Sequence, residues 1–119
     1  FSCVYLIALK AALFLAKETG KDTEAAALQK RINILSESIV NKFWDPAKEC
    51  FSDTLDRKTY SAHSNLFVIR AELISGDKLE KVKKHILKAL PSTFINAYNP
   101  NDGVYFAPSY AFYIFDGLY

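Results

Sequence analysis

The chain has 119 residues, enough for one domain or for a piece of a larger one. Half of the residues are hydrophobic and 24% are charged, a balance that excludes a disordered or low-complexity chain. The formal net charge is only +2, which argues against nucleic acid as a partner, because such proteins concentrate basic residues on one face. The sequence contains no Met, so we expect an internal piece of a longer protein.

Residues 1–16 are apolar except for Ser2 and Lys10. A membrane-spanning helix needs about 20 apolar residues, so this shorter run with a lysine at its middle is not expected to cross a membrane. The run also lacks the small residues of a signal-peptide cleavage site. We predict a helix over residues 2–18 that is buried on most sides and stops at Gly20. The cellular compartment does not follow from the sequence.

A second helix is predicted over residues 23–43, with Asp22 as its N-cap. Its apolar residues recur in steps of three and four, which is typical of a helix with one buried stripe and one solvated side. The stripe consists of Leu28, Ile32, Leu35, Ile39 and Phe43. The Asp45-Pro46 pair ends the helix, because a residue before proline disfavours the helical conformation.

A long polar stretch, residues 45–60, follows. Its segment 50–52 could be extended, but we predict no sheet from so short a run. A third helix is predicted over residues 61–74, apolar on most sides in its later part. Gly76 is expected to stop it.

Asp77 is expected to cap a fourth, amphipathic helix over residues 78–90, which Pro91 closes. Its apolar stripe consists of Leu79, Val82, Ile86 and Leu90, and its lysines are expected to form a solvated face. A second long loop precedes an aromatic-rich helix over residues 110–119.

The predicted helices alternate between mostly apolar and amphipathic, and the connections alternate between tight glycine turns and long loops. This regularity is typical of repeated helical hairpins, each with an inner apolar helix covered by an outer amphipathic one. We therefore predict an all-α fold, with residues 1–119 forming part of a single domain. The hairpins are expected to form an arc of a closed double ring of helices.

The long-loop end of these hairpins is where function is expected, since loops held by a rigid scaffold commonly carry it. Aromatic rings beside carboxylates and amides suit a carbohydrate, whose C–H faces stack on rings and whose hydroxyls need hydrogen-bonding partners. Candidate contacts are Trp44, Tyr60, His63 and Asn65. His63 fits equally well as a structural residue that ties down the loop.

Other reactive residues give weaker signals. The two histidines, His63 and His85, lie too far apart for a metal-binding motif, and we predict neither a metal nor a cofactor. We expect His85 to be solvated. Cys3 and Cys50 both fall at the long-loop end, and we expect free thiols because nothing indicates an oxidising compartment.

A glycosidase needs an acid and a base or nucleophile across the scissile bond. Only four of the predicted loop-end carboxylates could contribute: Glu49, Asp53, Asp56 and Asp102. They lie on polar stretches without an apolar environment to raise a pKa, so we expect each to be structural or solvated. No catalytic residue is assigned in this chain.

Four segments of the chain carry a resemblance to a known family. They are Tyr5-Leu6-Ile7-Ala8-Leu9-Lys10-Ala11-Ala12 with Leu15-Ala16 and Gly20, then Phe43-Trp44-Asp45, then Tyr60-Ser61-Ala62-His63-Ser64-Asn65, and finally Tyr105-Phe106 with Leu118-Tyr119. Together they span nearly the whole chain and resemble the middle of the catalytic domain of bacterial α-L-rhamnosidases. The third is similar to the family's Ser-Gln-His-x-Asn helix start, with Ala62 where Gln is common. Other six-hairpin glycosidases share the hairpin pattern and the aromatic inner helices.

The resemblance implies a six-hairpin (α/α)6 toroid and an inverting hydrolysis of terminal L-rhamnose. The family's acid and base are glutamates expected outside this chain, so the chain alone is expected to be inactive. His63 and Asn65 match only as pocket or scaffold positions. The alternatives are another six-hairpin glycosidase, trehalase-like or glucosidase-like, and a helical-repeat interaction module without catalysis.

An isolated arc leaves apolar helix faces uncovered, so we expect the chain to self-associate. The residues expected to lack full cover are Val4, Leu6, Leu13, Phe67, Phe112, Ile114 and Phe115.

Overall fold

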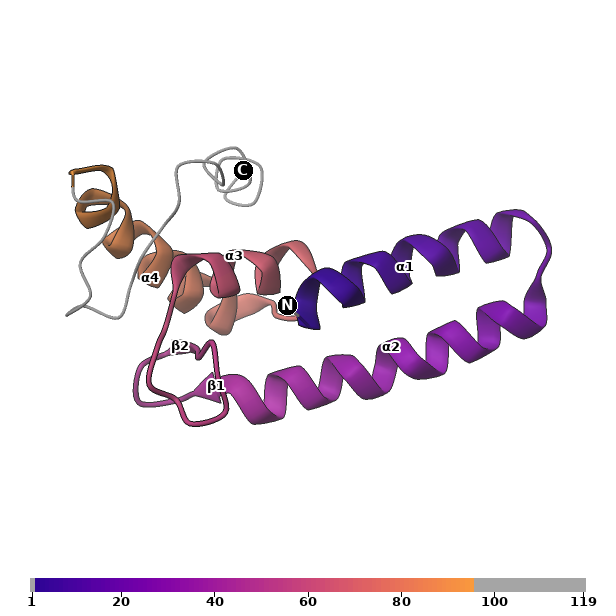
Figure 1. Cartoon of the computed structure of the whole chain (residues 1–119), viewed down its shortest axis with the longest axis horizontal. Coiled ribbons are helices and arrows are strands. Elements are labelled where there is room, and N and C mark those ends of the chain that lie inside the picture. Colours follow the sequence, from indigo (N-terminus) through magenta and orange to yellow (C-terminus); the bar gives the residue numbers. More distant parts are fainter. Residues whose placement is uncertain (1, 96–119) are drawn as a thin grey trace. The chain divides into compact units, whose positions relative to one another are not determined.

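The computed structural model describes residues 2–95, with side chains described from 2 to 88. Helices make up most of this range, which confirms the all-α class. The helices are α1 (Ser2–Glu18), α2 (Asp22–Phe43), α3 (Ala62–Arg70) and α4 (Gly76–Ile95), and two short strands, β1 (Trp44–Asp45) and β2 (Cys50–Phe51), lie between α2 and α3 (Figure 1). The predicted helix over 110–119 lies outside the described residues. No described helix is both long and apolar enough to cross a membrane.

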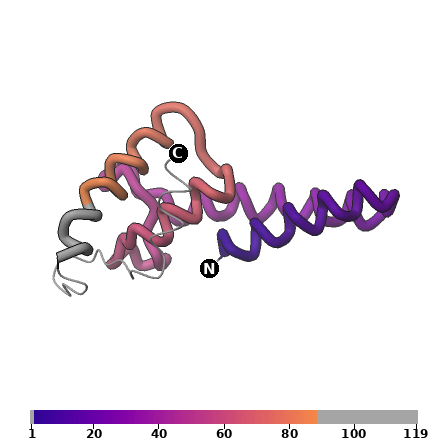
Figure 2. The backbone as a smooth tube through the Cα atoms, turned by 90° about the horizontal axis from the view of Figure 1, so that it is seen from above, coloured from indigo at the N-terminus to yellow at the C-terminus, as the bar shows by residue number. Residues whose placement is uncertain are grey.

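The chain divides into two compact units, Phe1–Lys42 and Phe43–Tyr119. In the first unit α1 and α2 run side by side in opposite directions, as two views of the backbone show (Figures 1 and 2). Their turn is a Schellman motif: the amide of Lys21 donates to the carbonyl of Ala16 at 2.8 Å, and that of Gly20 to Lys17 at 3.2 Å. Gly20 has φ of +69°, which confirms the predicted helix stop. α2 begins at Asp22, one residue earlier than predicted.

The hairpin buries one side of each helix. The buried residues are Leu6, Leu9 and Ala16 from α1 and Ala25, Ile32 and Ile39 from α2. The predicted stripe of α2 is confirmed, since Ile32 and Ile39 are buried and the other three residues are half-buried.

The prediction that α1 is buried on most sides is wrong for this structure. Val4, Tyr5, Phe14 and Leu15 are exposed, because a single packed neighbour covers only one side of a helix. The expectation of incomplete cover fails for Leu6, which is fully buried. Val4 is exposed, as expected, and Leu13 and Phe67 are half-buried; Phe112, Ile114 and Phe115 lie outside the described residues.

The second unit starts with a small antiparallel sheet, in which Trp44 pairs with Phe51 and Asp45 with Cys50. This sheet was not predicted, because segment 50–52 is so short. The strands form because the Asp45 carboxylate accepts from the amides of Ala47, at 2.9 Å, and Lys48, at 3.3 Å, which closes the turn between them. Phe51 and Cys50 are each 1% exposed, so the second strand belongs to the core.

Helix α3 ends at Arg70, earlier than the predicted Ile74. A second Schellman motif stops it: the amide of Leu73 donates to the carbonyl of Val68, and Glu72 adopts φ of +55°. Glu72, not a glycine, occupies the position with positive φ at this end.

Helix α4 begins at Gly76, two residues before the predicted start, and runs to Ile95. The prediction that Pro91 ends it is wrong. The helix continues past Pro91 although proline lacks a backbone donor.

Helices α3 and α4 pack against each other, and each of them also packs against β2. The largest fully buried side chains of this unit come from all three elements: Phe51, Leu66, Val68, Val82 and Ile86. The predicted stripe of α4 is confirmed at Val82 and Ile86, with Leu79 half-buried. This core fixes the position of the long loop between β2 and α3, where the candidate site lies.

Candidate functional site

Asn65 fastens β2 to the first turn of α3. Its Oδ1 accepts from the amide of Phe51 at 2.8 Å, and its Nδ2 donates to the Phe51 carbonyl at 2.9 Å. Nδ2 also donates to the carbonyl of Ser61 at 2.9 Å. The side-chain amide thus takes the place of a neighbouring strand along the outer edge of β2. Because Asn65 is 0% exposed and all its polar atoms bind main chain, it acts as a scaffold residue in this structure.

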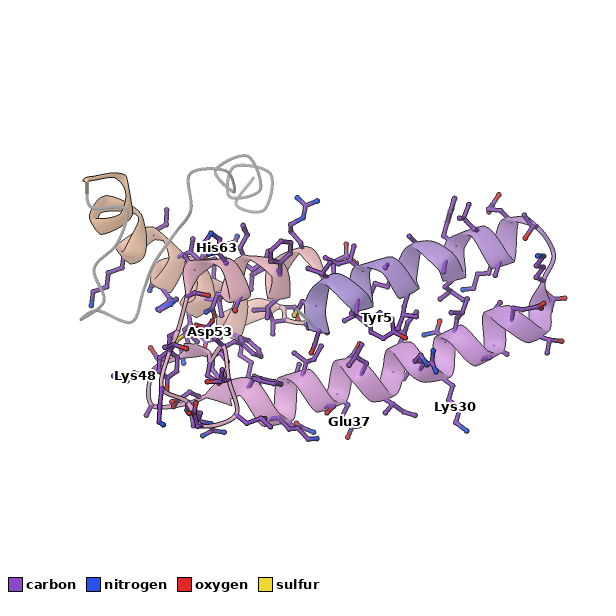
Figure 3. All side chains as sticks on the ribbon, in the orientation of Figure 1. Tyr5, Lys30, Glu37, Lys48, Asp53 and His63 are labelled. Atoms are coloured by element: carbon purple, nitrogen blue, oxygen red, sulfur yellow. The ribbon has the colours of Figure 1, made fainter. Side chains whose placement is uncertain are left out.

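Asp53 organises the loop that leads into α3. Its carboxylate accepts from the Ser61 amide, at 3.1 Å, and from the Ser61 hydroxyl, at 2.7 Å. The same hydroxyl accepts from the amide of Ser64 at 3.2 Å and so caps the helix. Figure 3 shows Asp53 in the loop beside the start of α3. Asp53 was expected to be structural or solvated, and these contacts give it a structural role.

Tyr60 joins the far end of the loop to β1. Its hydroxyl lies 2.7 Å from Oδ2 of Asp45 and 2.9 Å from the carbonyl of Arg57. The hydroxyl has one proton, and the carboxylate is the stronger and nearer acceptor. This hydrogen bond is the main reason that the pKa of Asp45 falls below its ordinary value. The same bond raises the pKa of Tyr60 to about 12.

Trp44 lies half-exposed at the start of β1. Its ring meets that of Phe51 edge to face, with centroids 5.2 Å apart, and the Lys78 ammonium lies 5.0 Å from its centroid. A cation over the face of an indole ring is attracted by the ring's electrons. Lys78 therefore contacts the Trp44 ring, in addition to lying on the solvated face predicted for the α4 lysines.

The two histidines lie in different surroundings. His63 is half-buried in the first turn of α3 (Figure 3). His85, on α4, is also half-buried, and its Nε2 lies 3.2 Å from the carbonyl of Tyr60, to which it donates. Burial lowers the pKa of His85. The prediction that His85 is solvated is therefore wrong: the amphipathic helix turns it toward the loop, where it supports Tyr60.

The other loop-end carboxylates make ion pairs. Glu49 lies 3.0 Å from the ammonium of Lys81, and Asp56 lies 3.2 Å from that of Lys58. A hydrogen bond from Thr54 lowers the pKa of Asp56. A carboxylate with a lowered pKa is ionised at neutral pH and is a poor general acid. Asp102 lies outside the described residues.

Both cysteines are free thiols, as expected. Burial raises the pKa of Cys3 and of Cys50 to about 11. The reactive species of cysteine is the thiolate, so these thiols are weak nucleophiles at neutral pH. Within residues 2–95, no group of three or more His, Cys, Asp or Glu side chains gathers as a metal site would need.

The hairpin of the first unit carries a separate open groove of about 560 Å³. Its lining consists of Tyr5, Ala27, Lys30, Arg31, Ile34, Leu35 and Ser38. The Tyr5 side chain points toward α2 (Figure 3), where its hydroxyl accepts from Arg31 at 3.2 Å. None of the four predicted sugar contacts lines this groove.

Three of those four contacts join one hydrogen-bonded and stacked assembly around β1 and β2: Trp44, Tyr60 and Asn65. His63 lies on the same first turn of α3 as Asn65.

Three partners of these residues were not predicted from the sequence: Asp45, Lys78 and His85. Each contacts a residue that is distant in sequence. The Asp-Pro turn after Trp44 was the one local signal that could have indicated Asp45.

Comparison of this chain with protein-family models, with curated proteins and with solved structures returned no match.

Tyr60→Phe is expected to lower the melting temperature by roughly 5 °C, the effect of losing one hydrogen bond in a domain of this size. Asp45 contributes stability above its unfolded pKa, and that contribution is lost as pH falls through its lowered folded pKa. The variant should therefore lose less of its stability on acidification. Thermal unfolding followed by circular dichroism between pH 7 and pH 3 measures both effects. Tyr5→Phe is the control, since its hydroxyl bond is exposed; equal shifts in both variants would contradict the role of Asp45.

Proposed function

We propose that this chain is part of a glycoside hydrolase resembling bacterial α-L-rhamnosidases. In this proposal residues 1–119 supply two helical hairpins, and the start of a third, to an (α/α)6 toroid. The complete enzyme would remove terminal L-rhamnose from a glycan or glycoside by inversion. Its general acid and general base would lie outside this chain, and no residue here is given a catalytic role.

The observation that carries the proposal is the half-exposed Trp44 beside the hydrogen-bonded pair of Asp45 and Tyr60. A sugar would stack a C–H face on the indole ring and direct its hydroxyls to the neighbouring polar groups. In the predicted hairpin pattern Trp44 and Tyr60 fall at the long-loop end, which would form the loop face of the toroid. Support also comes from the tight turn at Gly20, which joins the helices of the first unit as a hairpin repeat requires.

The four candidate residues divide by exposure. Trp44, Tyr60 and His63 are half-buried and keep surface for a ligand, so we propose them as sugar contacts. Asn65 has no exposed surface, and in this proposal it positions β2 and the start of α3 rather than touching the sugar.

Fluorescence tests the proposed sugar contact directly, because Trp44 is the single tryptophan of the chain. L-Rhamnose and an aryl α-L-rhamnoside should change Trp44 emission in a saturable way, whereas D-glucose and trehalose should not. His63→Ala should weaken the response, and Tyr5→Phe should leave it unchanged. A response to glucose or trehalose alone would favour another six-hairpin glycosidase, and no response to any sugar would contradict the proposal that Trp44 is a sugar contact.

The chain alone is expected not to hydrolyse a chromogenic aryl rhamnoside above background. Loss of one general acid or base typically costs a factor of about 100 or more, and here both roles are assigned outside the chain. Asp53→Asn and Asp102→Asn should leave this background unchanged. Turnover that disappears in either variant would show that the chain carries part of the catalytic pair.

A second function, a non-catalytic interaction module, is favoured by one feature. Four large apolar side chains of α1 are exposed, at 42% to 63% of their surface. Contiguous exposed apolar surface commonly marks a protein interface.

A further inference from the structure

An apolar stripe runs along the exposed side of α1. It consists of Val4, Ala8, Ala11 and Leu15, which we call the α1 seam. All four residues are exposed, Val4 at 42% and Leu15 at 61%. Their spacing of four, three and four residues is that of the contact positions in a two-stranded coiled coil.

The seam lies away from the side of α1 that packs in the hairpin. At 100° per residue, the buried Leu6 and Leu9 lie more than 90° around the helix from the centre of the seam. The seam itself carries no charge, and the charged residues of α1, Lys10, Lys17 and Glu18, are not members of it. Two such surfaces can therefore meet without like-charge repulsion.

The order of residue sizes makes the seam complementary to itself. Read from either end, it runs large, small, small, large. In an antiparallel pair related by a two-fold axis, Val4 lies opposite Leu15 of the second copy, and Ala8 opposite Ala11 of the second copy. The small residues let the helix axes approach closely at the centre, while the large residues fill the space at both ends.

The available area matches a weak specific dimer. With Tyr5 and Phe14 beside the seam, at 48% and 63% exposure, each copy offers on the order of 500 Å² of apolar surface. Two copies would bury at most about 1,000 Å², near the lower limit for a specific interface. We propose that the α1 seam is a homodimer interface, in which α1 of one copy packs antiparallel against α1 of a second copy of this chain.

This inference concerns the 119-residue chain and does not depend on the proposed function, because dimerisation requires no sugar site. In a longer chain built as a toroid, a neighbouring hairpin would compete for the same face.

Sedimentation equilibrium of the full chain tests the dimer. The average mass should rise with concentration from 13.4 kDa toward twice that value. Ala11→Glu places two carboxylates at the centre of the seam and should weaken dimerisation at least tenfold. Ala26→Glu is the control, because Ala26 is an exposed alanine on α2, outside the seam; it should change dimerisation less than twofold. A native chain that stays monomeric at high concentration, or equal effects of both substitutions, would overturn the proposal.

Cross-linking tests the antiparallel register without relying on a charged variant. In a Cys3→Ser background, with the 1%-exposed Cys50 retained, chains carrying Val4→Cys are mixed with chains carrying Leu15→Cys and mildly oxidised. The antiparallel pair predicts disulfides mainly between the two different chains, identified by mass. Cross-links formed equally well by Val4→Cys chains alone would indicate a parallel pair and overturn the proposal.

Discussion

Asn65→Ala is expected to lower the free energy of unfolding by about 3 kcal/mol, since a buried polar group left without a partner costs about 1–3 kcal/mol. The substitution leaves both the amide and the carbonyl of Phe51 without the partner that now lies at 2.8–2.9 Å. It also removes the donor to the Ser61 carbonyl. Urea denaturation followed by Trp44 fluorescence and by circular dichroism measures the change.

Asn33→Ala is the matched control for this prediction. Asn33 is exposed on α2 and accepts a hydrogen bond from Gln29 at 2.9 Å. Surface substitutions of this kind usually change stability by less than about 0.5 kcal/mol. If Asn65→Ala were as mild as Asn33→Ala, the hydrogen bonds from Asn65 to β2 would not hold the loop.

Phe51→Ala is the second prediction with a large effect, a loss of about 4 kcal/mol, as is typical of a fully buried aromatic residue. Phe51 is 1% exposed and lies where β2, α3 and α4 meet. The substitution also removes the ring that contacts Trp44, so the native-state emission of Trp44 should change. Chemical denaturation gives the first effect and the emission spectrum the second.

Phe14→Ala is the control for ring size, because Phe14 is 63% exposed. Measured at a concentration low enough to keep the chain monomeric, it should cost less than about 1 kcal/mol. A similar loss from both phenylalanine variants would contradict the burial of Phe51.

The losses of unfolding free energy caused by Asn65→Ala and Phe51→Ala should not add, because the Asn65 side chain is hydrogen-bonded to the main chain of Phe51. Without the Phe51 ring, water can hydrogen-bond to the main chain of β2, so Asn65→Ala then lowers the free energy of unfolding by less. A combined loss equal to the sum of the two single losses would show that the hydrogen bonds and the core act independently.

The amino-acid sequence by itself determined that these segments are helical and where the tight turn of the first unit lies. The stripe through Ile32 and Ile39 and the φ-positive Gly20 were both predicted, because helix periodicity and glycine's conformational freedom are local properties. For Asp53 the sequence predicted only a structural or solvated carboxylate, and the hydrogen bond from Ser61 decides between the two.

The small sheet, the position of Asn65 and the burial of His85 were decided only by the tertiary structure. Asn65 binds Phe51, 14 residues away, and His85 binds Tyr60, 25 residues away. No local pattern specifies such pairs, because each depends on the packing of α3 and α4 against β2. The exposure of one side of α1 could not be predicted from the sequence either. The apolar composition of α1 predicts burial, but the burial of a helix face depends on which elements pack against it. Apolar periodicity therefore predicts which residues are suited to burial, and the packing of the elements decides which of them are buried.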